Sequence, residues 1–196
     1  MRRKHNAKSG YIFFSLLFAV QVLFMSVVLI PAGSLKADDQ LTKRIRLLAD
    51  QGDREAQFSM GLRYDLGDGV VRDPELAVHW FAKAAAAGVS GACLYLGMKY
   101  EFGAGVKQDK EAAINWYERA AVQGWPQAAF LFGSLYLTRS NEDFLQGCAW
   151  LFIAAEQEYP GAEQTRLQKC SGGGNGFDRK VMALSHQLRQ QMLDAK

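Results

Sequence analysis

Apolar residues recur with a helical period over most of the chain after residue 40. In the segment 53–88 they form two stripes, each three or four residues apart in the way that marks one face of a helix. The first stripe holds Ala56, Met60, Gly61 and Tyr64, and the second holds Ala77, Trp80, Phe81, Ala84 and Ala85. Each stripe is flanked by charged positions. The pattern predicts two amphipathic helices joined by a short turn.

The same pattern returns after 36 residues. When 53–88 is aligned with 89–124 without a gap, 13 of 36 positions are identical. A third copy starts in register at Ala128 and is two residues shorter in its loop, and residues 40–51 match the second half of a unit. Fixed periods of this length are typical of solenoids. We therefore divide the chain into 1–37, a targeting segment; 38–52, a partial leading repeat; 53–88, 89–124 and 125–158, three repeats; and 159–196, C-terminal helices and cap.

Glycines and an aspartate punctuate each repeat. Gly67 and Gly69 are predicted to supply the positive φ angles that end the first helix and reverse the chain. Asp73 is expected to cap the second helix, with Pro74 at its first position. The Gly-x-Gly spacing does not indicate a dinucleotide loop, because it follows a helix, lacks a third glycine and occurs twice.

These positions together resemble a known family. The frame Ala-x-x-x-x-Gly-x-x-Tyr-x-x-Gly-x-Gly-Val-x-x-Asp-x-x-x-Ala-x-x-Trp-x-x-x-Ala-Ala-x-x-Gly is similar to that of Sel1-like (Sel-one-like) repeats, relatives of the tetratricopeptide repeat. The resemblance covers about residues 40–158. It implies an all-α fold, a right-handed superhelix of helix-turn-helix units, and a role in holding other proteins together.

The C-terminal region departs from the repeat. Residues 161–170 read as one more first-type helix, and 171–176 is a glycine-rich break. A last helix follows whose apolar residues share one side, as a cap over the end of a solenoid requires. Those residues are Phe177, Val181, Leu184, Leu188 and Met192.

The N-terminus has the layout of a targeting segment. Basic residues come first, an uncharged and mostly apolar run occupies 11–30, and small residues lead to Ala37. The run is longer than the core of most signal peptides and long enough to span a bilayer. Two readings stay open, a cleaved signal peptide and a retained membrane anchor. Both export the rest of the chain, to the periplasm or cell envelope, and membrane contact is expected only through residues 11–30.

Net charge argues against a nucleic-acid partner. The whole chain has a formal charge of +3, but residues 38–196 hold all 20 acidic and only 18 of the 23 basic residues, which leaves −2. The excess of positive charge therefore belongs to the targeting segment. We expect no nucleic-acid binding.

Catalytic and metal-binding motifs are not found. The three histidines are scattered, and no His-Glu-x-x-His, Cys-x-x-Cys, Gly-x-Ser-x-Gly or Ser-x-x-Lys occurs. We expect no metal, no cofactor and no enzymatic activity. Some relatives are proposed to act on cell-wall or β-lactam substrates, so the alternative is a hydrolase of that class.

Two of the three cysteines are predicted to pair. Cys148 and Cys170 lie 11 residues before and after Tyr159, where the third repeat should turn back on itself. An antiparallel pairing brings them to the same level, and a disulfide requires Cα atoms within about 7 Å. Cys93 is expected to be a packed or partly exposed free thiol.

The candidate functional site is a surface. In the tetratricopeptide architecture that the chain resembles, the first helix of each unit lines the concave side, where a partner protein or peptide binds. The corresponding positions are Phe58, Leu62, Asp65, Leu94, Met98, Glu101, Phe130, Ser134 and Leu137. An alternative is open for Phe58, Leu94 and Phe130, which would then pack between helices. The sequence thus predicts a non-catalytic scaffold or adaptor; in a third interpretation the stack only stabilises a membrane complex through its anchor.

Overall fold

The structure is a computed structural model that describes residues 32–137, 141–171 and 174–194. Every regular element in those residues is an α-helix, so the described chain is all-α, as predicted. The helices are α2 (Ala32–Asp50), α3 (Arg54–Leu66), α4 (Pro74–Ala86), α5 (Ser90–Phe102), α6 (Lys110–Val122), α7 (Pro126–Tyr136), α8 (Asn141–Glu156), α9 (Ala162–Cys170) and α10 (Gly174–Asp194).

The chain divides into two compact units, residues 1–41 and 42–196. The described part of the first unit is the first half of α2. Most of the predicted targeting segment, including the apolar run 11–30, lies outside the described residues. The second unit holds the rest of α2 and the helices α3 to α10.

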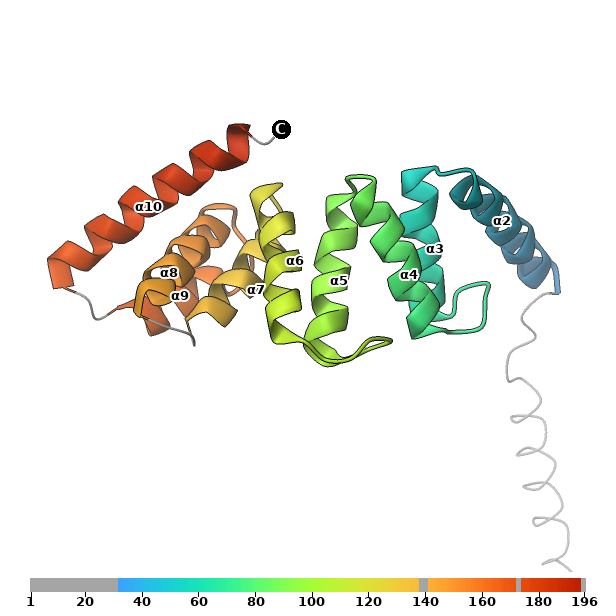
Figure 1. Cartoon of the computed structure of the whole chain (residues 1–196), viewed down its shortest axis with the longest axis horizontal. Coiled ribbons are helices and arrows are strands. Elements are labelled where there is room, and N and C mark those ends of the chain that lie inside the picture. Colours follow the sequence, from blue (N-terminus) through green and yellow to red (C-terminus); the bar gives the residue numbers. More distant parts are fainter. Residues whose placement is uncertain (1–31, 138–140, 172–173, 195–196) are drawn as a thin grey trace, which may run out of the picture. The chain divides into compact units, whose positions relative to one another are not determined.

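Within residues 42–196 the helices pack mainly on their neighbours in the chain. Each of α3 to α8 contacts the next helix along, α8 also contacts α9, and α10 lies across α8 and reaches α6 (Figure 1). Contacts between successive elements and few others define a solenoid of helical repeats. The first helices of the units are α3, α5 and α7, and the second helices are α4, α6 and α8.

The predicted turn chemistry is present in both well-matched repeats. Gly67 and Gly103 follow α3 and α5 in the left-handed conformation, with φ of 77° and 68°, and their N–H groups bond to the carbonyls four residues earlier. Asp73 then caps α4, because its carboxylate accepts hydrogen bonds from the N–H groups of Glu75 and Leu76. Asp109 caps α6, and its carboxylate accepts a hydrogen bond from the N–H group of Ala112. The two loops are therefore built on the same plan.

Small residues let the two helices of a unit approach closely. A Cβ atom added to Gly97 on α5 would lie 2.5 Å from two ring carbons of Tyr117 on α6, and Gly61 stands in the same relation to Phe81. The aromatic ring of the second helix therefore occupies the space that a side chain on the first helix would need. This explains why glycine stands at this position in both repeats.

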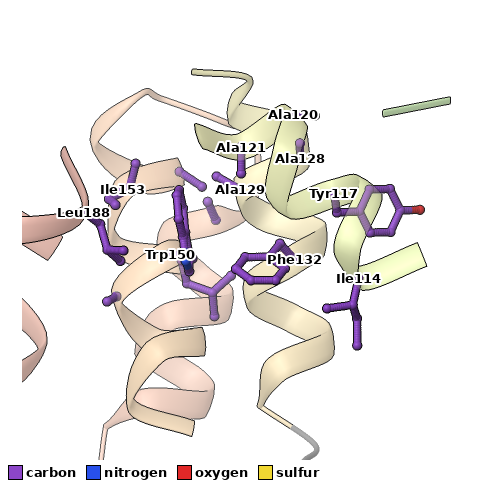
Figure 2. Close-up of a cluster of buried hydrophobic side chains, with 14 of the residues drawn as sticks. Ile114, Tyr117, Ala120, Ala121, Ala128, Ala129, Phe132, Trp150, Ile153 and Leu188 are labelled. Carbon is purple, nitrogen blue, oxygen red and sulfur yellow. The ribbon is translucent and has the colours of Figure 1, made fainter. Parts of the chain in front are cut away.

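The buried residues form two clusters. One lies mainly on α3, α4 and α5, around Met60 and Phe81, and the other runs from α5 to α10. In the second cluster Phe132 meets Trp150 edge-on, with ring centroids 5.5 Å apart (Figure 2). Both predicted stripes face these clusters: only Ala85 among their residues is not fully buried.

The C-terminal helix α10 covers the last unit. Val181, Leu188 and Met192 are buried in the second cluster, and Phe177 and Leu184 pack against it. The cap predicted from the apolar spacing is therefore present. The predicted break at 171–176 is too long, however, because α10 begins at Gly174. Two glycines, Gly174 and Gly176, are thus part of the helix despite their low intrinsic helix propensity.

Candidate partner-binding surface

The nine predicted contact residues do not share one environment. Eight are partly buried, but Leu94 is 2% exposed and belongs to the second cluster. The prediction of a partner contact at Leu94 is therefore wrong. Its helix α5 lies in the interior of the stack, with neighbouring units on both sides, and this position is closed by packing.

The two aromatic candidates pack mainly within the protein. The ring of Phe58 lies 5.8 Å from that of Phe81 and 5.7 Å from that of Tyr95, measured between centroids. Phe130 lies 5.1 Å from Tyr159. Interhelical packing is thus a principal role of both residues, as the alternative interpretation held. Phe58 also keeps part of its surface at the edge of a hollow described below.

The two acidic candidates already have partners in the chain. Asp65 on α3 accepts a hydrogen bond from the ammonium group of Lys99 on α5, so this ion pair joins consecutive repeats. The side chains of Lys99 and Asp65 are 10% and 15% exposed. Glu101 Oε2 accepts a hydrogen bond of 2.6 Å from the hydroxyl of Tyr117. Burial and the adjacent Glu101 carboxylate raise the pKa of Tyr117 far above its usual range.

Three open hollows are lined by residues that the structure describes, and the largest of these three crosses the starts of the first helices. We call it the Trp125 hollow; it has a volume of about 350 Å³. The indole Nε1 of Trp125 donates a hydrogen bond of 2.8 Å to Ser90 Oγ, which fixes the ring over the start of α5. The lining residues are Arg54, Glu55, Phe58, Gly88, Val89, Ser90, Gly91 and Trp125.

A second hollow lies between α2 and α3. This Leu62 hollow has a volume of about 270 Å³ and is lined by Ile45, Ser59, Leu62, Arg63, Leu66 and Asp68. Arg63 is held there by hydrogen bonds to Thr42 Oγ1 and to the Asp68 carbonyl, both of 3.1 Å. Leu66 is 74% exposed, so the hollow has an apolar rim.

The third hollow lies where α7, α8 and α9 meet. This Lys169 hollow has a volume of about 240 Å³, and two of its lining residues, Ser134 and Leu137, are predicted contact residues. The complete lining is Ser134, Leu137, Phe144, Thr165 and Lys169. Leu62, Phe58 and these two residues therefore open onto three separate hollows rather than one continuous groove.

A disulfide joins α8 and α9 beside the third hollow. Cys148 and Cys170 are linked, with an Sγ–Sγ distance of 2.05 Å and a Cα–Cα distance of 5.9 Å, inside the limit that the pairing requires. Cys93 is a buried free thiol, and desolvation by burial raises its pKa. A buried thiol with a raised pKa is unreactive.

The described residues offer little for catalysis. They contain no group of three or more His, Cys, Asp or Glu side chains placed to hold a metal ion. The groups with a shifted pKa are Cys93, Tyr117, Glu163 and Arg166. None of these four lines one of the three hollows.

Sequence reasoning did not single out Trp125 as a functional residue. It occupies the position of the N-cap of α7, where the first repeat has the capping residue Asp53, and it makes no side-chain cap. The sequence could have indicated a special role for this residue, because a tryptophan stands where the first repeat has a capping residue. Lys99 was also missed, although the equivalent position in the first repeat is the basic Arg63.

The fold and the repeated turns define a helical repeat protein. The family model of the Sel1 repeat matches residues 54–89 and 90–125. A Sel1 repeat protein from Oxalobacter formigenes is similar in structure, with a TM-score of 0.57 and 34% identity over 64% of this chain and 96% of that one. The chain belongs to the Sel1 repeat family.

A longer solved structure is also similar. It is a protective antigen of uropathogenic Escherichia coli with an SLR fold, with a TM-score of 0.65 and 27% identity over 81% of this chain. Our chain spans only 34% of the length of that antigen. No curated protein matches the sequence. Sel1 repeat proteins are generally non-catalytic scaffolds for protein–protein interaction.

The described helices do not meet the requirements for a membrane span. None of them is both long enough and apolar enough to cross a bilayer. The apolar run 11–30 is outside the residues to which this finding applies.

Proposed function

We propose that this protein is a non-catalytic scaffold that binds a peptide segment of a partner protein on the face formed by its first helices. The observation that carries the proposal is the Trp125 hollow, because side chains from three successive repeats line it. A surface that needs several repeats to be complete is the kind of site that a solenoid provides.

Two aromatic rings give this hollow an apolar contact within a lining that is otherwise largely polar. Trp125 is 38% exposed, and its ring is fixed by the hydrogen bond to Ser90. Gly91 lies between Phe58 and Trp125, where a Cβ atom would be 3.2 Å from one ring and 3.4 Å from the other. The absence of a side chain at Gly91 keeps the space between the rings open. Exposed, oriented tryptophans are frequent anchors of protein–protein contacts.

The backbone beside the hollow suits a peptide. The N-cap of α5 is Val89, which makes no side-chain hydrogen bond, so the first N–H groups of this helix have no side-chain acceptor. Arg54 and Glu55 flank the same hollow with exposed charges of opposite sign. A peptide carbonyl can accept from the free N–H groups while its apolar side chain contacts the aromatic rings.

We place this activity in the cell envelope. The Cys148–Cys170 disulfide supports an oxidising compartment, because such bonds persist mainly in exported proteins. The predicted targeting segment 1–37, cleaved as a signal peptide or kept as an inner-membrane anchor, would deliver the chain there. The right-handed sense of the superhelix is likewise part of this proposal. A hydrolase is not proposed, because no specific observation favours one.

The test is a crosslinking capture from native envelopes with mass spectrometry. Trp125→Ala removes the anchor, and Arg54→Glu reverses an exposed charge without touching the core. Met182→Ala is the matched control, since Met182 is 52% exposed on α10, away from the first helices. The proposal expects a partner that is captured by the wild type and the control and lost in both hollow variants, with unchanged circular dichroism. Capture of the same proteins by all four chains would refute it.

A further inference from the structure

The Lys169 hollow differs from the other two because an ion pair is incomplete there. In the first two repeats Lys99 on α5 pairs with Asp65 on α3. The second repeat has 36 residues and the third has 34, so the position two repeats after Lys99 is 70 residues further on. That position is Lys169 on α9. Ala92 on α5 and Ala162 on α9, both buried, obey the same spacing. Lys169 is therefore the counterpart of Lys99 on α9.

The acidic partner of Lys169 is missing. The positions equivalent to Asp65 are Glu101 in the second repeat and Leu137 in the third. Leu137 and Lys169 both line the hollow. Lys169 has no ion-pair partner among the described residues, whereas its neighbour Arg166 on the same helix is paired with Glu163 at 2.7 Å. One exposed ammonium group thus stands at the mouth of the hollow without a carboxylate.

The hollow also contains unused hydrogen-bonding capacity. Ser134 Oγ is buried and has no hydrogen-bond partner. Thr165 lies one helical turn before Lys169 on α9 and lines the same space. A buried polar group without a partner costs about 1–3 kcal/mol. Because Ser134 Oγ lies below the surface of the hollow, a ligand would recover part of this cost only if the Ser134 side chain turned toward it.

The walls of the hollow are held in place. The disulfide at Cys170 ties α9 to α8 one residue after Lys169. Phe144 on α8 lies 5.9 Å from Phe177 on α10, measured between ring centroids, so the cap helix supports the opposite wall. A site whose walls are fixed before binding loses less entropy when a ligand arrives.

We propose that the Lys169 hollow binds the C-terminal residue of a partner protein, and this proposal deepens the scaffold function above. The α-carboxylate pairs with Lys169 in place of the missing aspartate, and the apolar side chain contacts Leu137 and Phe144. The volume of about 240 Å³ is below the roughly 300–1,000 Å³ typical of drug-sized ligands, so it suits one side chain. A C-terminal residue carries its carboxylate directly beside its own side chain, which an internal aspartate or glutamate does not.

The proposal is tested with two small probes and the full chain. N-acetyl-L-leucine carries the carboxylate, and N-acetyl-L-leucinamide is its neutral counterpart. Each is titrated into isotope-labelled protein in a nonionic detergent, and binding is followed by the NMR shifts of residues 134–137 and 165–169. We expect the acid to bind about tenfold more tightly than the amide. Equal binding of the two would overturn the proposal.

Variants identify the group responsible. Lys169→Ala should remove the preference for the acid, and Leu137→Asp should abolish acid binding because it supplies the missing carboxylate from within the chain. Lys180→Ala is the control, since Lys180 is also exposed but lies on α10. Unchanged acid binding in both Lys169→Ala and Leu137→Asp would overturn the proposal.

The outcomes separate this inference from the scaffold function and from other ligands. Hexanoate that binds as tightly as the acid probe would indicate a lipid-type ligand and overturn the choice of a protein C-terminus. If the acid probe does not bind while Trp125→Ala still abolishes partner capture, the inference fails and the scaffold function stands. If the probe binds with the expected preferences and Trp125→Ala has no effect on capture, the Trp125 hollow fails and the Lys169 hollow stands.

Discussion

Lys99 on α5 forms an ion pair with Asp65 on α3, and both side chains are largely shielded from water. The pair connects the first helices of successive repeats. It joins full charges of opposite sign on the face predicted to bind a partner. Its contribution is therefore to hold two units in register rather than to contact a ligand.

Removal of one member of this pair should destabilise the protein. Lys99→Met leaves a shielded carboxylate without its cation. We expect the free energy of unfolding to fall by about 3 kcal/mol, the lower end of the range for buried ion pairs. The double variant Lys99→Met/Asp65→Leu should recover most of that loss. Urea unfolding measures the free energies.

The Arg189–Glu156 pair provides a control. Its side chains are 35% and 38% exposed, so Arg189→Met should cost less than about 1 kcal/mol. If Lys99→Met were as mild as Arg189→Met, the pair would not hold the repeats together.

Tyr117 should make the stability fall at alkaline pH. The pKa of Tyr117 in the folded protein is raised above the value of about 10 in the unfolded chain. The contribution of this residue to the free energy of unfolding is therefore complete below pH 10 and is lost as the pH rises further. Well above pH 10, the free energy of unfolding should fall by about 1.4 kcal/mol for each pH unit. The variant Tyr117→Phe should lack this loss of stability at alkaline pH.

The free energies of unfolding of the wild type and of Tyr117→Phe are compared between pH 8 and 11. The ring of a phenylalanine fits here, since Phe81 occupies the equivalent position in the first repeat. Because Cys93 titrates equally in both chains, the difference between them isolates Tyr117. A difference that stays constant across this range would show that the hydroxyl is not shielded as described.

Loss of the disulfide should weaken the C-terminal half. Cys148 and Cys170 are 22 residues apart, and closing a loop of that length in the unfolded chain corresponds to about 3 kcal/mol in the chain-entropy model. The variant Cys148→Ala/Cys170→Ala should lose roughly this amount in urea unfolding. Cys93→Ala, which removes a thiol outside the bridge, should lose clearly less.

Reduction provides an independent check on the same bond. The two cysteines are 0% and 6% exposed, so a thiol reductant should act slowly on the folded protein and rapidly once urea unfolds it. Equal rates in the two conditions would contradict the burial of this disulfide.

Gly97→Ala should destabilise the second repeat. The added Cβ would lie 2.5 Å from two carbons of the Tyr117 ring, and the forced displacement costs about 1–3 kcal/mol. Gly176→Ala is the matched control, because it lies on α10 with no neighbouring atom within 4 Å and should be neutral or slightly stabilising. Thermal unfolding followed by circular dichroism compares the two, and an equal response would contradict the close approach.

Local rules explain how much of the fold could be predicted. The positive φ of Gly67 and the capping carboxylate of Asp73 are short-range features that depend on a few neighbouring residues, and both were predicted. The apolar stripes likewise follow from helical geometry. The start of α10 at Gly174 was not predicted, because glycine has a low helix propensity by itself and packing of the following apolar face outweighs it.

The surface was harder to predict because it depends on contacts between repeats. Leu94 and Phe58 occupy equivalent positions, yet Leu94 is buried while Phe58 reaches a hollow. A single repeat pattern assigns them the same environment. Whether Leu94 or Phe58 is covered depends on the side chains of the adjacent repeat. The 36-residue period does not predict those side chains.

Three partly buried residues, Ala85, Tyr100 and Trp116, pack against both hydrophobic clusters. Without them the N-terminal and C-terminal halves of the stack would each have a core of their own and could melt one after the other. Because these three side chains belong to both cores, the opening of one half strips contacts from the other. We therefore expect the repeats to unfold as a single cooperative block, so that molecules with only one half open, which a protease could cut, are rarely populated.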